Sequence, residues 1–144
     1  MSDADFHAIS KLMAELSPSS QLLGTRFIAW DEETSTVTLG FTPPPSFASP
    51  RRHVQGGLVA GFLDEAMGAA FCGATKGEHL VLNLDLNLTL MRPVPIAPLT
   101  AKGRAIRTGK RVAFLEAELF DEAGKMLARA TSTALSTPAA DGLG

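Results

Sequence analysis

The sequence predicts an α+β protein in which an antiparallel sheet wraps around one long central helix. The stretch from Val54 to Phe71 has the composition of a helix that is apolar on nearly every side, and a helix of this kind is buried. Six segments with strand character accompany it, two before and four after. Most connections beside these segments are short, which favours antiparallel pairing.

Length and composition indicate one globular domain over residues 1–144. The chain is 45% hydrophobic and 19% charged, with a formal net charge of −2, so charge gives no reason to expect nucleic acid or an anionic membrane as partner. The single cysteine, Cys72, fits a reducing compartment. Residues 1–16 do not have the pattern of a signal peptide, and the apolar helix is too short for a membrane span and carries two carboxylates. We expect a soluble, cytoplasmic protein.

The first part of the chain predicts a helix and a hairpin. Apolar residues at helical spacing predict an amphipathic helix over about 4–16, which the segment Ser17-Pro18-Ser19-Ser20 ends. Thr25–Trp30 and Thr36–Phe41 then predict the two strands of a hairpin. The central helix follows and is expected to finish at Lys76-Gly77.

An alternation of leucines predicts the strand after the central helix. Every second residue from Leu80 to Leu90 is leucine. Strand side chains alternate between two faces, so the pattern predicts one long strand whose leucine face lies on the core. Further strands are predicted over Leu99–Arg107, Arg111–Phe120 and Met126–Leu135. The small and polar end, about 136–144, is expected to be frayed.

The chemistry is expected at the central helix, because charged residues in an apolar helix are costly unless they are paired or used. Gly56 and Gly57 open this helix, where the first N–H groups lack intrahelical acceptors and suit a developing oxyanion. Asp64 follows Gly57 by nearly two turns, on the same face but about 10 Å along the axis.

An attacking group and the oxyanion donors must both lie about 3 Å from the reacting centre. If Asp64 supplies the attacking group and Gly57 a donor, one chain cannot satisfy this requirement, whereas two antiparallel chains can. The spacing therefore predicts a homodimer with shared sites, and it leaves open whether dimers pair into tetramers.

Several segments resemble the PaaI-type acyl-CoA thioesterases, which include phenylacetate-pathway and 4-hydroxybenzoyl-CoA enzymes. The loop Phe47–Gly57 and the stretch Leu63–Gly68 are similar to this family, and so are Leu90–Pro93 and Gly109–Phe114. The resemblance covers about residues 22–135. It implies a hotdog fold and hydrolysis of an acyl-CoA to free acid and coenzyme A, with no cofactor because coenzyme A is part of the substrate.

The resemblance also implies roles for residues at the helix start. Asp64 would be the nucleophile or the general base for water, and the amide of Gly56 or Gly57 would polarise the thioester carbonyl. Gln55 stands where many members have histidine; it can hydrogen-bond the thioester but cannot act as a base. Ser49 stands where an asparagine or glutamine usually helps to place the nucleophile or water.

Other residues are candidates for substrate binding. Glu65 lies about 100° around the helix from Asp64 and is either an ordinary helix carboxylate or the alternative nucleophile. His53 lies two residues before Gln55 and is expected to play a supporting or peripheral role. Coenzyme A carries phosphates that favour cations at a pocket mouth, and the candidates are Arg92, Lys110 and Arg111, with Arg51 and Arg52 beside the loop. No spacing of histidine and cysteine indicates a metal site.

Two other functions stay open. A non-catalytic acyl-CoA binding or sensing protein on the same fold is favoured if the amide missing at Ser49 matters for turnover. A hotdog dehydratase or hydratase needs a catalytic histidine with an acidic partner, and the surroundings of His53 do not match that pattern. The chain has eight Phe, one Trp and no Tyr, which does not decide between an aryl and a medium-chain acyl group.

Overall fold

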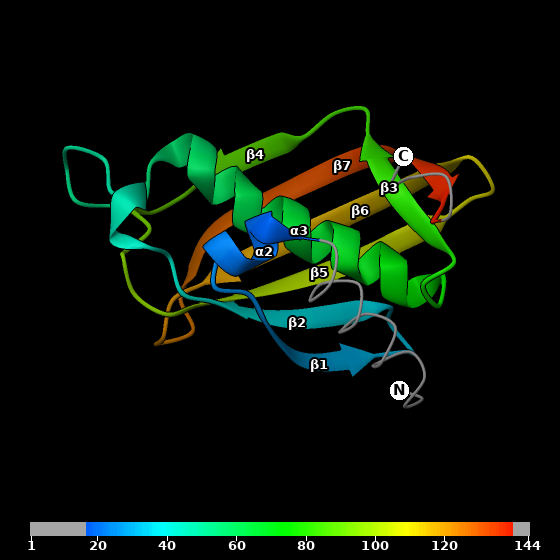
Figure 1. Ribbon diagram of the computed structural model, residues 1–144, viewed down its shortest axis with the longest axis horizontal. Coiled ribbons are helices and arrows are strands. Elements are labelled where there is room, and N and C mark those ends of the chain that lie inside the picture. The colour runs from blue at the N-terminus through cyan, green and yellow to red at the C-terminus, as the bar shows by residue number, and fades with distance from the viewer. Residues whose placement is uncertain (1–16, 140–144) are drawn as a thin grey trace.

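A computed structural model of the protein describes residues 17–139. Seven strands form one sheet that curls around helix α3 (Gly56–Ala74), as Figure 1 shows. The strands lie in the order β1-β2-β5-β6-β7-β3, and β4 also pairs with β7. Every pairing is antiparallel. The predicted class, an antiparallel sheet wrapped around a long central helix, is confirmed.

The remaining elements agree with most of the predicted ones. The predicted hairpin, the central helix and the last three strands are confirmed within a few residues. The helix expected over about 4–16 lies outside the described residues. In chain order the other elements are α2 (Pro18–Leu22), β1 (Arg26–Asp31), β2 (Thr36–Phe41), a 3-10 turn η1 (Pro45–Phe47), β3 (His79–Asn83), β4 (Asn87–Leu90), β5 (Leu99–Thr108), β6 (Val112–Phe120) and β7 (Met126–Pro138).

The segment Ser17–Ser20, predicted to end the helix of residues 4–16, begins the short helix α2. Ser17 is the N-cap of α2, and its hydroxyl accepts a hydrogen bond from the amide of Ser20 at 3.0 Å. Pro18 occupies the first helical position, where its missing N–H costs nothing. Serine and proline interrupt a helix or start one, so the composition of this segment did not distinguish the two cases.

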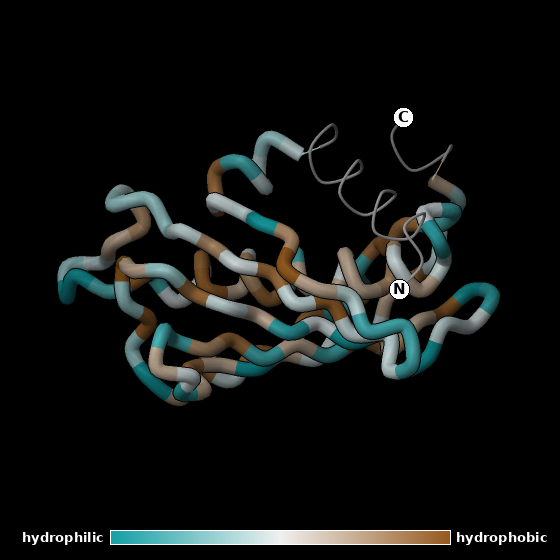
Figure 2. Tube along the Cα trace, turned by 90° about the horizontal axis from the view of Figure 1, so that it is seen from below, coloured by the Kyte–Doolittle hydropathy of each residue, from teal (hydrophilic) through white to brown (hydrophobic). Residues whose placement is uncertain are grey.

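Helix α3 packs tightly on β5. A Cβ atom placed on Gly103 of β5 would lie 2.1 Å from the carbonyl oxygen of Ala66 in α3, so only glycine allows the helix to come this close. Phe62 of α3 is fully buried, and its ring centroid lies 5.0 Å from that of Phe41 on β2. Buried and more exposed residues alternate along β5 and β6, as expected for a sheet with one buried face. Hydrophobic and hydrophilic residues follow one another along parts of the trace in Figure 2.

The length and hydropathy of α3 also match those of a membrane span. It has 19 residues with a mean hydropathy of 1.2, so the expectation that it is too short was wrong: 19 residues fall within the range for a span. The sheet nevertheless covers it, and 56% of this apolar stretch is buried inside the protein. Its apolar character is therefore accounted for by its place in the core.

The single long strand predicted from the leucines is wrong. It is divided into β3 and β4, because the four steps from Asn83 to Asn87 span only three on β7, from Ala134 to Thr131. One extra residue moves all later side chains to the opposite face. Val81 of β3 and Leu88 of β4 consequently both pack on the core. The other leucines of the row with large exposed fractions are Leu82 (59%), Leu84 (58%), Leu86 (39%) and Leu90 (49%).

The chain end predicted to be frayed is partly a strand. Strand β7 continues to Pro138, and Ser136 and Thr137 pair with Val81 and Leu80 of β3. This pairing uses main-chain groups, which a polar composition does not reveal. Residues 140–144 lie outside the described part of the chain.

Candidate functional site

Three residues shape the start of α3. Gln55 is the N-cap, and its Oε1 accepts the amide of Leu58 at 3.0 Å. A Cβ on Gly57 would lie 3.0 Å from that same oxygen, so glycine leaves room for the capping side chain. Within residues 17–139 the amides of Gly56 and Gly57 donate no hydrogen bond. Both N–H groups are therefore available to a ligand at the positive end of the helix dipole.

The loop before α3 is a tight turn held by its main chain. The amide of Ser49 donates to the carbonyl of His53 at 2.7 Å, and the amide of Arg52 donates to the carbonyl of Ser49 at 2.8 Å. Arg52 has a φ of 66°, a left-handed conformation that costs energy for a residue other than glycine. Ser49 thus closes the turn that presents Arg51 and Arg52. It lies in the same loop as Gln55, away from the middle of α3 that carries Asp64.

Asp64 is half-buried in the middle of α3 and faces the end of β3. The side-chain amide of Asn83 donates a hydrogen bond to its Oδ1. The Ser132 hydroxyl lies 3.2 Å from Oδ1 of Asn83 and 2.8 Å from the carbonyl of Asp85. A side-chain amide therefore does stand beside the carboxylate, but it comes from β3 and not from position 49.

Sequence reasoning missed Asn83. Asn83 is one of the residues that alternate with the leucines between Leu80 and Leu90. Because the leucines were expected on the core, the residues between them were expected to face solvent. In β3 this side of the strand faces the helix, so Asn83 meets Asp64. The available signal was the pattern itself, read with the opposite face on the core.

Glu65 contacts different elements from Asp64. The hydroxyls of Ser20 and Thr25 both donate to its carboxylate, and Ser20 is buried. Glu65 thereby joins α2 and the start of β1 to the central helix. Asp64 instead faces the β3 edge of the sheet, so the two neighbouring carboxylates serve different surroundings.

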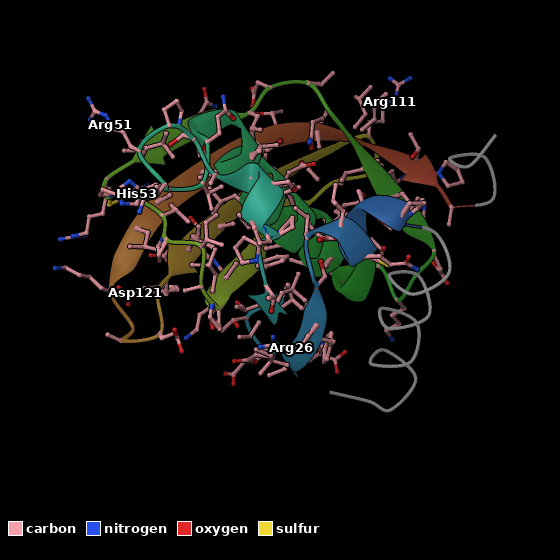
Figure 3. The ribbon with its side chains drawn as sticks, turned by 60° about the vertical axis from the view of Figure 1, so that its left-hand side comes forward. Arg26, Arg51, His53, Arg111 and Asp121 are labelled. Atoms are coloured by element: carbon pink, nitrogen blue, oxygen red, sulfur yellow. The ribbon has the colours of Figure 1, made fainter. Side chains whose placement is uncertain are left out.

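The basic candidates separate into two groups. Arg51 and His53 lie at the end of the molecule where α3 begins, and Arg111 lies at the opposite end (Figure 3). Lys110 precedes Arg111 in the β5–β6 turn, where the carbonyl of Arg111 accepts the amide of Ser136 at 2.9 Å. Arg92 follows β4 and joins Arg51 beside the helix start.

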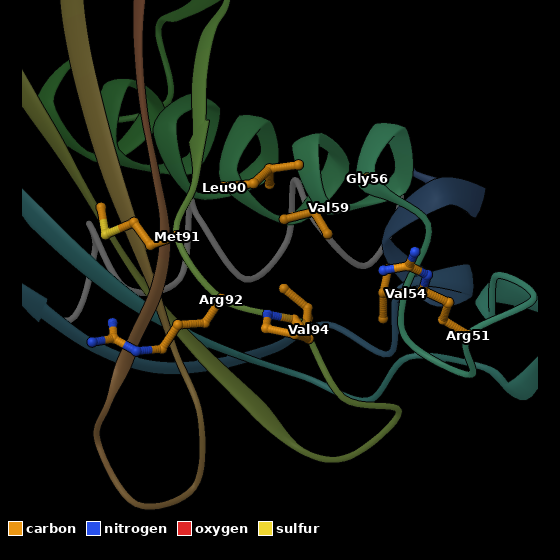
Figure 4. A pocket seen from close by; sticks show the side chains of 9 residues that line it. Arg51, Val54, Gly56, Val59, Leu90, Met91, Arg92 and Val94 are labelled. Atoms are coloured by element: carbon orange, nitrogen blue, oxygen red, sulfur yellow. The ribbon is translucent and has the colours of Figure 1, made fainter.

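A pocket of about 490 Å³ lies beside the start of α3 (Figure 4). Three valines of its lining are buried, whereas both arginines are exposed. The pocket therefore has an apolar floor and a rim that carries positive charge. Its lining residues are Arg51, Val54, Gly56, Val59, Leu90, Met91, Arg92, Pro93 and Val94.

This fold and site define a class of enzyme. Residues 52–128 match the Thioesterase superfamily, which is more than half of the chain, and the chain belongs to this superfamily. Thioester hydrolysis is therefore its general reaction. No curated protein matches the chain.

Solved structures narrow the class further. A phenylacetic acid degradation-related protein from Ralstonia eutropha JMP134 is 26% identical, with a TM-score of 0.78 over 89% of this chain and 98% of that one. The PaaI protein of the phenylacetic acid degradation operon of E. coli is 17% identical and has the same fold, with a TM-score of 0.81 over 93% and 94%. A Streptococcus mutans UA159 protein bound to acetyl CoA is 13% identical, with a TM-score of 0.69 over 79% and 89%. The protein is a PaaI-like thioesterase with the hotdog fold, as the resemblance predicted.

Proposed function

We propose that the protein hydrolyses acyl-CoA thioesters to free acid and coenzyme A, at active sites formed between two copies of the chain. The spacing on α3 carries this proposal. The helix runs without a break from the unbonded amides of Gly56 and Gly57 to Asp64, so these groups are about 10 Å apart along one axis. The attacking group must lie about 3 Å from the carbonyl carbon, and the donors about 3 Å from the carbonyl oxygen bonded to it. A second, antiparallel α3 supplies the missing partner.

The edge formed by β3 and β4 supports association with a second copy. This edge lies at the end of the sheet, where main-chain groups are left to pair with another strand. Leu86 and Leu90 are 39% and 49% exposed beside it, and exposed apolar surface of this kind favours a partner. Asp64 reaches the same edge through Asn83. Leu82 and Leu84, which are 59% and 58% exposed, continue this apolar surface along the same edge on the other face of the sheet.

Two routes lead to the same products. In the first, a carboxylate oxygen of Asp64 attacks the carbonyl carbon, coenzyme A leaves as its thiolate, and water hydrolyses the acyl-aspartyl anhydride. In the second, Asp64 takes a proton from a water molecule that attacks the carbon directly, and the thiolate leaves. In both routes the amides of Gly56 and Gly57 stabilise the oxyanion. Asn83 holds one oxygen of Asp64 and leaves the other free to react.

The coenzyme A part of the substrate is supported by two observations. The related fold from Streptococcus mutans is bound to acetyl CoA. The pocket beside Gly56 carries Arg51 and Arg92 on its rim and no acidic residue in its lining, which suits a substrate that carries phosphates. No cofactor is needed in either route.

Thiol release from a panel of acyl-CoAs tests the proposal. Native protein and Asp64→Asn are compared on short, medium, long and aryl acyl groups. We expect the variant to lose at least about a hundredfold in kcat with an unchanged unfolding temperature. Equal rates for both proteins would contradict the role of Asp64. Saturable binding without hydrolysis by native protein would identify a binding protein instead.

The assay can use a thiol reagent directly. Cys72 is buried, and this burial raises the pKa of its thiol to about 11. A protonated, enclosed thiol reacts slowly. We expect no labelling of the folded protein and one labelled thiol per chain in urea.

A further inference from the structure

We propose that Arg51 and Arg92 form a subsite for the phosphate groups of the coenzyme A portion, with the pantetheine arm on the apolar floor of the adjoining pocket. This inference rests on the proposed acyl-CoA substrate. It assigns phosphate binding to two of the basic residues in the chain. It also gives the direction in which the bound coenzyme A portion extends from the reacting carbonyl.

The pocket has the shape and polarity for an apolar stem that ends in an anion. Its floor is formed by Val54, Val59 and Val94, which are 5%, 1% and 3% exposed. Arg51 and Arg92 on its rim are exposed, so the pocket opens to solvent between them. Methylene and methyl groups gain free energy on such a floor, while bulky, charged groups remain at the mouth.

None of the residues from 17 to 139 neutralises the positive charge on the pocket rim. No acidic residue lines the pocket. Within residues 17–139 neither guanidinium forms an ion pair, since the pair found there joins Arg104 to Glu116. Exposed, uncompensated guanidinium groups are well suited to phosphate, which they can bind through two parallel hydrogen bonds.

A hydrogen bond holds the head of Arg92, and the turn from Ser49 to His53 holds the main chain of Arg51. Arg92 Nη1 donates to the carbonyl of Met126 at 2.6 Å, which fixes the head and leaves its other N–H groups for a ligand. Asp121 is an acidic residue in the turn that precedes Met126. Its Oδ1 accepts the amides of Ala123 and Lys125 at 3.0 and 2.9 Å, so this carboxylate oxygen bonds its own turn and not Arg92. Arg51 sits at the tip of the turn that Ser49 closes.

The subsite is continuous with the proposed oxyanion site. Gly56 lines the pocket, and its amide is one of the two unbonded donors at the start of α3. A thioester whose carbonyl oxygen binds there therefore extends one of its two ends into this pocket. The open, exposed rim favours the coenzyme A end, because the nucleotide is too large to be enclosed and must reach solvent. A carboxylate at the far end of a dicarboxylic acyl group has the same chemistry, and the experiment separates the two.

Binding is measured first, without turnover. Coenzyme A, dephospho-coenzyme A and pantetheine are titrated by calorimetry into native protein, Arg51→Ala and Arg92→Ala. Each variant should weaken binding of coenzyme A about tenfold, a common cost of one charge-assisted hydrogen bond, and leave pantetheine within about twofold. Arg129→Ala is the matched control, because Arg129 is exposed on the outer face of β7, and it should leave both affinities unchanged.

Kinetics then separates the sources of the anion. With an acyl-CoA, each variant should raise KM about tenfold and leave kcat within about twofold; with the matching acyl-pantetheine, neither constant should change. A different result would show that the arginines bind the acyl end. In that case the variants would raise KM for dicarboxylic acyl-pantetheines, and for acyl-CoAs only when the acyl group carries a carboxylate, and the assignment would be overturned. Equal losses with acyl-CoA and acyl-pantetheine would overturn it as well.

The two proposals fail in different ways. If native protein binds coenzyme A in this arginine-dependent manner but hydrolyses no acyl-CoA, the proposed hydrolysis fails and the subsite stands. If native protein hydrolyses acyl-CoAs and both variants behave like Arg129→Ala, the subsite fails and the proposed hydrolysis stands.

Discussion

The two sides of helix α3 differ in how far the rest of the chain packs on them and satisfies their hydrogen bonds. On the side facing β5 the helix packs directly on Gly103, and Phe62 and Ala66 are fully buried. On the side facing the β3–β4 edge lie Gly57 and Asp64, with unbonded main-chain donors and exposed leucines nearby. The side of the helix that faces β5 is fully packed within a single chain. The side that faces the β3–β4 edge has polar groups and apolar surface that a single chain leaves open, and we call these the finished and the unfinished side.

The residues on the two sides of the helix differ accordingly. The finished side contains small and apolar residues whose sizes match the space between helix and sheet. The other side has Asp64 and Gly68 in the helix interior, residues that cost stability there. We infer that the second side is completed by substrate and by another copy of the chain.

The largest expected effect is a loss of stability from a substitution on the side of α3 that faces β5. Gly103→Ala places a methyl group against the main chain of α3, where 2.1 Å separates the two positions, and we expect a loss of at least about 3 kcal/mol in the free energy of unfolding. Gly68→Ala is the control on the other side. Its new methyl would lie 3.8 Å from Val81, and alanine is favoured over glycine in a helix by up to about 1 kcal/mol. Urea titration measures both; equal stabilities would contradict the comparison.

The next effect separates the two neighbouring carboxylates. Asp64→Asn should reduce kcat at least about a hundredfold, or about 2.7 kcal/mol of barrier, and leave stability unchanged. Glu65→Gln should do the reverse. It weakens the hydrogen bonds from Ser20 and Thr25, which lowers stability by about 1–2 kcal/mol, while kcat stays within a few fold. If Glu65→Gln were the inactive variant, the assignment of the carboxylates would be wrong.

A smaller effect is expected from charging the open edge. Leu82→Glu combined with Leu84→Glu places like charges near their copies across an antiparallel contact, which is unfavourable. We expect a shift of mass from dimer to monomer in light scattering and a loss of about tenfold in activity per chain at micromolar concentration. Ile28→Glu is the control, because Ile28 is 48% exposed on β1, the other edge of the sheet. A double variant that stays dimeric and active would place the interface elsewhere.

The smallest effect concerns the residue that holds Asp64. Asn83→Ala removes the amide from Oδ1 of Asp64, and we expect kcat to fall about tenfold with KM unchanged, because a mispositioned group slows the chemical step. Asn87→Ala removes a similar side chain from β4, where its contacts are 3.5 Å long, and should stay within about twofold of native kcat. Equal rates for both variants would show that Asn83 does not position the carboxylate.

Local patterns in the sequence were sufficient for most of the fold. An apolar helix with a glycine start and strands separated by turn residues have signatures within a few positions, and these elements formed as expected. The break between β3 and β4 has no such signature. It depends on which residues of β7 lie opposite Asn83 and Asn87, and the leucine alternation continues through it unchanged.

The same limit applies to the site. One apolar helical segment contains Asp64, Gly56 and Gly57, so their spacing could be predicted from the sequence. Asn83 contacts Asp64 through strand register, and Arg51 and Arg92 line one pocket because two loops pack together; neither arrangement follows from local sequence. The extension of β7 to Pro138 was hidden in the same way, because its partner is β3.

Active-site sharing is tested most directly by complementation between two inactive chains. Asp64→Asn and Gly57→Val, which fills the space beside the helix start, are expressed together with different tags, and the mixed dimer is isolated through both tags. If each site takes Gly57 from one chain and Asp64 from the other, one of the two sites is intact. The account predicts about half of the native activity for the mixed dimer, although each variant alone is inactive. A mixed dimer as inactive as its parents would show that each chain carries its own complete site, and the central claim would be wrong.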